Sequence, residues 1–149
     1  MDNKQRTVLL YLKSIKYLKQ QKQVKMRLLE EAYAEQFSIK AVRFDSTKTS
    51  SNSKDRSPVE NAIYKFMMKE IKLTAQIEKI NKEIDLRSDL IETLDDDATK
   101  TLFMIRYLEC KSWKAVMETL HIPSSTTFYL HNKGLSKLYK EYRHRSQWE

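Results

Sequence analysis

The sequence predicts an all-α protein, in which a long helical hairpin or coiled coil precedes a C-terminal trihelical helix-turn-helix domain. The chain of 149 residues contains only one glycine and two prolines. Sheets and barrels need many tight turns, and such turns rely on these two residue types. Lysine, glutamate, leucine and methionine are abundant, and all four favour helices. Long stretches without glycine or proline also carry apolar residues at helical spacing.

The composition argues against several classes of protein. Because Cys110 is the single cysteine, an intrachain disulfide scaffold and a cysteine-based zinc site are excluded. The histidines at positions 121, 131 and 144 lack the spacing of a metal site, and there is no glycine-rich phosphate loop and no nucleophile–base pair. The segment MDNKQRTVLLYLKS makes a poor signal peptide, and no apolar run approaches about 18 residues. We expect a cytoplasmic protein that is neither an enzyme nor a cofactor-binding or membrane protein.

The net charge of +8 is unevenly distributed along the chain. Residues 1–57 carry a net charge of +7, residues 58–100 carry −3, and residues 101–149 carry +4. The two basic ends can contact phosphate, and the acidic middle can pair with basic helices. Simple solvation of the charged surface is the alternative interpretation.

Residues 3–37 are expected to form the first helix. Its apolar positions follow helical spacing: Val8, Tyr11, Leu12, Ile15 and Leu18, roughly continued by Val24, Leu28, Ala32 and Phe37. Lysines recur every third residue from Lys13 to Lys25. This spacing lags the 3.6-residue turn, so the lysines wind around the helix. We interpret them mainly as a solvated surface, with phosphate contact as the alternative.

Residues 44–57 have the composition of a mobile loop, rich in serine, threonine, asparagine and aspartate. A helix is expected to begin directly after it. Ser57 can serve as the N-cap, Pro58 as the first helical residue and Glu60 as the third, which is the pattern of a capping box.

The helix over residues 58–94 shows regular heptads. Its two seam positions are taken by Ile63, Glu70, Ile77, Ile84 and Ile91, and by Phe66, Leu73, Ile80, Arg87 and Leu94. Such a seam indicates packing against another helix along its whole length. The partner is either residues 3–37 of the same chain, as an antiparallel hairpin, or the same helix of a second chain. Glu70 and Arg87 interrupt the seam and can specify its register at a cost in stability.

The C-terminal domain, residues 95–149, changes to short helices. Residues 97–109 form the first, begun by the acidic residues 95–97, and Ser112 caps the second. The turn His121–Ile122–Pro123 leads to a third helix over residues 125–142. The expected inward residues are Leu102, Ile105, Leu108, Trp113, Val116, Met117, Leu120, Thr127, Leu130, Leu135 and Leu138. Residues 1–94 would form a separate long-helix module for dimerisation or interaction.

Three helices with this spacing are typical of a helix-turn-helix whose last helix lies in the DNA major groove. Serine, threonine and asparagine can bond base edges, and lysines can meet phosphates. A phosphate is also expected at the start of the second helix, where amides point outward. The expected DNA-binding residues are Lys111, Ser112, Lys114, Ser124, Ser125, Thr126, Phe128, Tyr129, Asn132, Lys133 and Lys137, with Lys140 as a further phosphate contact.

Several of the residues in this domain also have plainer interpretations. Tyr107 and Trp113 fit core positions better than stacking platforms, and Cys110 fits a small buried or half-buried residue. His131 could touch DNA or cover the core. Phe128 and Tyr129 are adjacent, so at least one of them should be exposed, which favours a contact role.

The run RYLECKSWKAVMETLHIPSSTTFYLHNKGLSKL resembles sigma-factor region 4, and still more closely the phage regulators of the RinA and ArpU type. The residues that carry this resemblance are Arg106, Tyr107, Ser112, Trp113, Ser125 and Thr126. The sequence departs from the pattern at Cys110 and His121, where glycine is common, and at Met117, where alanine is usual. The specific motifs lie within residues 94–138.

The resemblance implies a sequence-specific, DNA-binding transcriptional regulator that activates phage or prophage late genes. Its partner would be double-stranded promoter or operator DNA near the nucleoid of a bacterial host. Host RNA polymerase would be a further partner. A homodimer through the heptad helix 58–94 is expected. The alternative is an interaction module that binds polymerase or another regulator without reading DNA itself.

Overall fold

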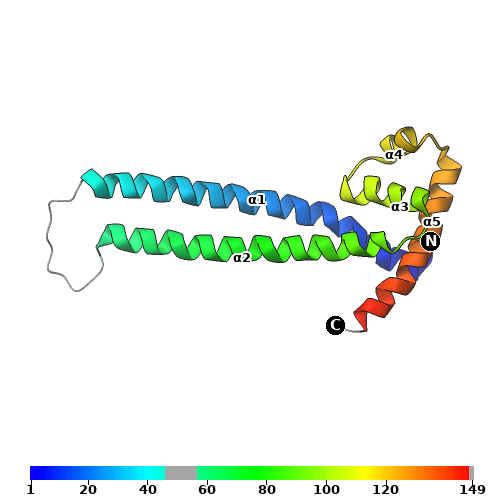
Figure 1. The fold of residues 1–149 in the computed structure, drawn as a ribbon, viewed down its shortest axis with the longest axis horizontal. Coiled ribbons are helices and arrows are strands. Elements are labelled where there is room, and N and C mark those ends of the chain that lie inside the picture. The colour runs from blue at the N-terminus through cyan, green and yellow to red at the C-terminus, as the bar shows by residue number, and fades with distance from the viewer. Residues whose placement is uncertain (46–56, 148–149) are drawn as a thin grey trace. The chain divides into compact units, whose positions relative to one another are not determined.

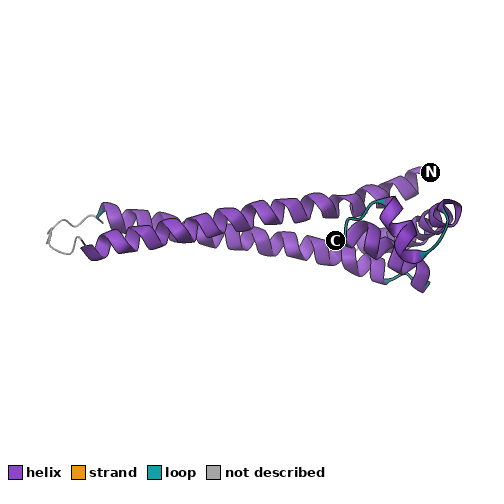
Figure 2. Ribbon diagram, turned by 90° about the horizontal axis from the view of Figure 1, so that it is seen from above, coloured by secondary structure: helices purple, strands orange, loops and turns teal. Residues whose placement is uncertain are grey.

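A computed structural model describes residues 1–45 and 57–147, apart from the side chains of residue 40 and residues 42–45. Over these residues the fold is all-α, as the sequence predicts, and has no strand (Figures 1 and 2). Most of the expected loop 44–57 lies outside the described residues. The chain divides into two compact units, one of Met1–Gln20 with Lys82–Glu149 and one of Gln21–Asn81.

Two long helices pair in the N-terminal part of the chain (Figure 1). Helix α1 spans Asn3–Asp45 and is longer than expected, and helix α2 spans Pro58–Glu92. The backbone N–H of Glu60 donates to Ser57 Oγ at 3.1 Å, which confirms Ser57 as the cap of α2. Side-chain bonds from Lys25 to Gln76 and from Tyr33 to Glu70 join the helices in antiparallel order. In the structure, α2 therefore packs against α1 of its own chain, which is the first of the two predicted arrangements.

The predicted seam of α2 faces inward over its full length. All ten of its positions are buried or half-buried, and Leu73, Ile80, Ile91 and Leu94 are buried. Glu70 accepts a hydrogen bond of 2.7 Å from the Tyr33 hydroxyl. This bond is the main reason why the pKa of Tyr33 is raised. Only the protonated hydroxyl can donate it, so the bond favours the protonated form.

The outer part of the α1 seam differs from the expectation. Ala32 is buried, but Val24, Leu28 and Phe37 are 47%, 36% and 76% exposed. Inward positions instead follow three- and four-residue steps through Lys22, Lys25, Leu29, Ala32, Gln36 and Ile39, all of them buried or half-buried. Val24 and Leu28 stand one residue before the inward positions Lys25 and Leu29. One residue corresponds to a rotation of about 100° around the helix axis, so both side chains point away from α2. Here α1 therefore presents a partly polar seam to α2.

The other compact unit contains the short helices of the C-terminal domain. These are α3 (Asp97–Phe103), the π-helical segment η1 (Met104–Leu108), α4 (Trp113–Leu120) and α5 (Ser124–Ser146). Because α3 runs directly into η1, together they correspond to the helix expected over residues 97–109. The expected inward residues are buried or half-buried, and Phe103 is fully buried as well.

The first turns of α1 belong to the core of this domain, which the sequence analysis did not anticipate. Val8, Leu12 and Ile15 are fully buried in one cluster with Leu102, Phe103, Ile105, Tyr107, Val116, Leu135 and Leu138 of the short helices, and with Leu90, Ile91 and Leu94. Each fully buried aliphatic side chain of this kind stabilises the fold by about 1.5–3 kcal/mol. The core of the short helices is therefore completed by a segment more than eighty residues earlier in the chain.

Candidate nucleic-acid interface

Local hydrogen bonds set where the short helices begin. Asp96 is the N-cap of α3, and its Oδ2 accepts a 3.0 Å hydrogen bond from the backbone N–H of Thr99. Hydrogen bonds from Thr99 hold the pKa of Asp96 below its ordinary value. Ser112 caps α4, with its Oγ accepting from the N–H of Ala115 at 3.2 Å. Both starts agree with the sequence prediction, and the Ser112 cap places the open amides of α4 at the surface.

The turn between α4 and α5 has the left-handed residue expected of it. His121 ends α4 at φ 55° and ψ 45°, and the N–H of Ile122 bonds to Met117 O at 3.3 Å. Pro123 then precedes the first residue of α5. Cys110 also has a positive φ of 58°. A positive φ suits glycine, so both residues hold a backbone conformation that side chains rarely adopt.

Helix α5 has one buried face and one exposed face. Thr127, His131, Gly134, Leu135 and Leu138 are buried. The opposite side exposes Ser124, Ser125, Thr126, Phe128, Tyr129, Asn132 and Lys133. With Lys111, Ser112, Lys114 and Lys137, all eleven residues expected to bind DNA are exposed. The first three turns of α5 therefore present hydroxyl, amide, aromatic and ammonium groups to the exterior.

The adjacent aromatics Phe128 and Tyr129 are both exposed, by 44% and 63%. The Phe128 ring lies against Trp113, with centroids 5.4 Å apart, so this contact orients it. Tyr129 lies beneath Lys133, whose Nζ is 5.8 Å from the centre of the ring. Tyr129 is thus the more available of the two for contact with a partner.

Beneath the exposed face, a buried aromatic pair supports α5. The Tyr107 hydroxyl and His131 Nε2 are 2.6 Å apart, and the Phe103 ring stacks on His131. Burial lowers the pKa of His131 to about 4, and the charges of Arg106 and Lys13 add to this effect. Burial also raises the pKa of Tyr107. Of the two interpretations of His131, the structure supports the core residue, and Tyr107 is a core residue as expected.

Trp113 is half-buried between the core and the surface. Its ring makes an edge contact with His131 at 4.7 Å, and the Arg106 guanidinium carbon lies 4.7 Å from its centre. Arg106 Nη1 also donates to the carbonyl of Lys111 at 2.7 Å. Arg106 is thereby held beside the start of α4.

Lys137 is engaged within the protein. Its Nζ lies 3.1 Å from Asp95 Oδ1, and this hydrogen bond lowers the pKa of Asp95. Both side chains are exposed, and exposed pairs contribute little stability. A phosphate at Lys137 would compete with this carboxylate, whereas Lys111, Lys114, Lys133 and Lys140 have no ion pair among the described residues.

The start of α1 borders the exposed face of α5. Gln5 Nε2 donates to Asn132 O at 3.1 Å and to Ser136 Oγ at 2.8 Å. A pocket of about 360 Å³ is lined by Met1 and by residues of α1, η1, α4 and α5: Leu9, Lys13, Arg106, Tyr107, Trp113, Phe128, His131 and Asn132. The sequence predicted Phe128 and Asn132 as contacts and phosphate contact by the α1 lysines as an alternative, but not that α1 lies beside α5 here. The surplus of lysine in the first helix was the one available signal.

The lysines of α1 fall into two groups. Lys13 and Lys16 are exposed, as a solvated surface requires, but Lys19, Lys22 and Lys25 are half-buried. Lys19 Nζ donates to the carbonyl of Leu108, at the end of η1. The prediction that all these lysines are solvated is therefore wrong for Lys19, Lys22 and Lys25. Their side chains lie partly in the surface through which α1 packs against other helices.

Within the described residues, no group of three or more histidine, cysteine or carboxylate side chains could hold a metal ion. None of the described helices is long and apolar enough to cross a membrane. Comparison of the chain with protein-family models, with curated proteins and with solved structures found no match.

Proposed function

We propose that this chain is a sequence-specific DNA-binding protein that regulates transcription, with α5 as its recognition helix. The observation that carries the proposal is the division of α5 into a buried face and a polar exposed face at the start of the helix, directly after a tight turn from α4. In helix-turn-helix proteins this arrangement places the first turns of the second helix against base edges.

In this proposal the exposed residues have different roles. Thr126 and Asn132 lie on the exposed face, and their side chains can bond base edges, asparagine being suited to adenine. Lys133 meets a phosphate beside the groove. Lys111, Ser112 and Lys114 surround the start of α4, where free amides and two ammonium groups favour a second phosphate. Phosphates position the protein, and bases provide the specificity.

The biological setting of the proposal comes from the resemblance of residues 94–138 to phage regulators of the RinA and ArpU type. On that basis we propose a bacterial, cytoplasmic regulator that activates phage or prophage late genes. A homodimer remains part of the proposal. Because the seam of α2 is covered by α1 of the same chain, such a dimer would use outer residues of the helix pair, such as Met67, Met68 and Ile71.

The proposal is tested by selecting bound sequences from random double-stranded DNA and measuring affinity for the selected site. The variant Thr126→Ala/Asn132→Ala should lose the preference for that site over random DNA, with its melting temperature unchanged. Thr74→Ala, an exposed threonine on α2 in the other compact unit, is the control and should bind like the wild type. Failure of selection to enrich any sequence would refute sequence-specific binding.

A second candidate function, a protein-interaction module, is favoured by exposed apolar side chains on the helix pair. Tyr33, Met67 and Met68 are each about half exposed, and Phe37 and Ile71 are 76% and 61% exposed. Such residues are common in protein interfaces. If the chain retains RNA polymerase in a pull-down but binds no DNA at low salt, where phosphate contacts are strongest, this function replaces the first.

A further inference from the structure

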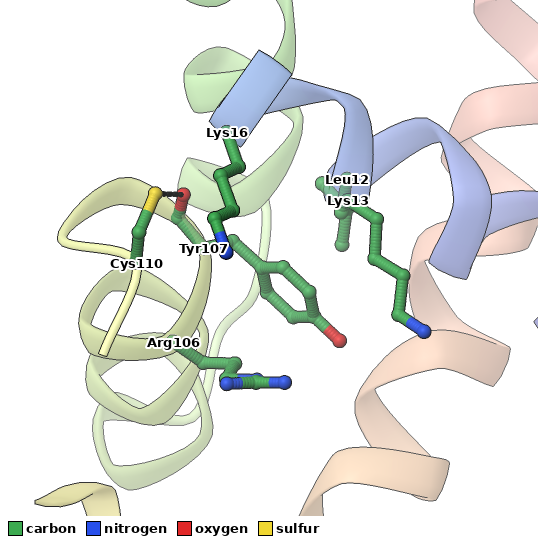
Figure 3. Close-up of a pocket in the computed structure, with 6 residues that line it drawn as sticks. All are labelled: Leu12, Lys13, Lys16, Arg106, Tyr107 and Cys110. Carbon is green, nitrogen blue, oxygen red and sulfur yellow. Dashed lines mark hydrogen bonds between the residues drawn. The ribbon is translucent and has the colours of Figure 1, made fainter. Parts of the chain in front are cut away.

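A small basic pocket lies between α1 and η1, inside the unit that contains the helix-turn-helix (Figure 3). Its volume is about 90 Å³, and it is lined by Leu12, Lys13, Lys16, Arg106, Tyr107 and Cys110. Figure 3 shows the ammonium groups of Lys13 and Lys16 and the Arg106 guanidinium arranged around the Tyr107 ring. Pockets for drug-sized ligands are about 300–1,000 Å³. This pocket therefore suits a single small group.

The positive charge of this pocket is not neutralised by the protein. None of the ion pairs in the described part of the chain involves Lys13, Lys16 or Arg106. Arg106 is held in place by the Lys111 carbonyl and the Trp113 ring, neither of which cancels its charge. Three cations around one pocket repel each other, and an anion bound among them relieves that repulsion.

The basic pocket borders the proposed DNA-reading surface. Lys13, Arg106 and Tyr107 also line the larger pocket of about 360 Å³, which reaches Phe128 and Asn132 on α5. The anchoring contact of Arg106 is the carbonyl of Lys111, one residue before the cap of α4. A duplex read by α5 would therefore have its backbone close to the pocket.

We propose that Lys13 and Lys16 of α1, together with Arg106, bind one phosphate of the DNA backbone beside the site read by α5. This inference rests on the proposed DNA binding and deepens it, because it makes α1 part of the interface. Arginine and lysine are the residues that favour phosphate, and the fork of a guanidinium fits two phosphate oxygens. A phosphate contact carries no sequence information, so the pocket should add affinity and not specificity.

The test compares Lys13→Gln/Lys16→Gln with the control Lys72→Gln/Lys79→Gln, which makes the same charge change at exposed lysines of α2 in the other unit. Affinity for the selected duplex and for random DNA is measured over a series of salt concentrations. The pocket variant should bind both DNAs about tenfold more weakly, as expected for a lost charge-assisted contact. Its slope of log affinity against log salt should fall by about 0.9, the value for one phosphate. The control should retain the wild-type slope.

Three results would overturn the inference, and they are distinguishable. If the wild type binds the selected duplex and the pocket variant matches the control in affinity and slope, the pocket holds no DNA phosphate. If inorganic phosphate raises the melting temperature of the wild type but not of the pocket variant, while their DNA binding is equal, the pocket serves a free anion. If the wild type binds no DNA at all, the proposed function fails, and the inference fails with it.

Discussion

The Tyr107 hydroxyl and His131 Nε2 lie 2.6 Å apart in the core of the short helices, and His131 is only 4% exposed. The pair joins η1 to the buried face of α5. It therefore holds α5 from its buried side, while the residues proposed to read DNA lie on the exposed side.

The free energy of unfolding should fall as the pH is lowered from about 6.5 towards 4. The pKa of His131 is about 4 in the folded protein and about 6.5 when the residue is solvated. Between these values the unfolded chain binds a proton that the folded chain does not, so stability decreases with decreasing pH. The full difference corresponds to about 3 kcal/mol.

The pH effect is measured by urea unfolding at several pH values, with His131→Gln as the reference. Glutamine can still bond Tyr107 but does not titrate, so the difference between the two proteins isolates the imidazole from the carboxylates. An equal pH dependence of wild type and variant in this window would contradict the burial of a neutral His131.

Gly134→Ala should destabilise the protein although alanine is the better helix former. A Cβ at this position would lie 2.5 Å from Phe103 Cε2 and 2.9 Å from Thr99 Cγ2. Overpacking of this kind costs about 1–3 kcal/mol, against a gain in helix propensity of about 1 kcal/mol. We expect a net loss of up to about 2 kcal/mol in chemical denaturation.

Making room beside Gly134 provides the matched control. In the background Phe103→Leu, which removes the ring atoms nearest to the added Cβ, Gly134→Ala should cost less than in the wild type. A stabilised single variant, or an equal cost in both backgrounds, would show that the close approach of α3 and α5 does not require this glycine.

His121→Gly should stabilise the protein by up to about 1 kcal/mol. His121 has a left-handed conformation at the end of α4, where a side chain costs about 1–2 kcal/mol and glycine costs nothing sterically. Part of the gain is lost because glycine makes the unfolded chain more flexible. Thermal unfolding should show a higher melting temperature for His121→Gly and a lower one for His121→Val, and the reverse order would contradict the turn geometry.

Arg87→Ala should destabilise the pairing of α1 and α2 by about 1.5–3 kcal/mol, the range for a lost hydrogen bond to a charged group. Arg87 Nε donates to Ser14 Oγ at 2.8 Å and to Tyr11 O at 3.2 Å, and its guanidinium lies 4.2 Å from the Tyr11 ring centre. The control Glu83→Ala removes only the partly exposed ion pair of Arg87 and should cost about 0.5 kcal/mol. Equal losses in urea unfolding would indicate that Arg87 acts through Glu83 alone.

The sequence by itself determined the all-α class, the order of the helices and much of their local detail. The caps Ser57, Asp96 and Ser112 and the turn at His121 depend on neighbouring residues, so a local pattern contains the information for them. The seam of α2 was also predictable, because eight of its ten positions are apolar. The exposed face of α5 followed from its buried face by helical geometry.

Only the tertiary structure decided what those faces pack against. Helical periodicity shows which side of α1 is apolar, but not that Val8, Leu12 and Ile15 enter the core of a domain at the other end of the chain. The periodicity also weakens where polar residues such as Lys25 and Gln36 occupy inward positions, so Val24 and Leu28 were assigned to the wrong side. The basic pocket of Lys13, Lys16 and Arg106 has the same origin. Contacts between distant segments depend on how whole surfaces fit together, and the spacing of residues within one helix does not specify that fit.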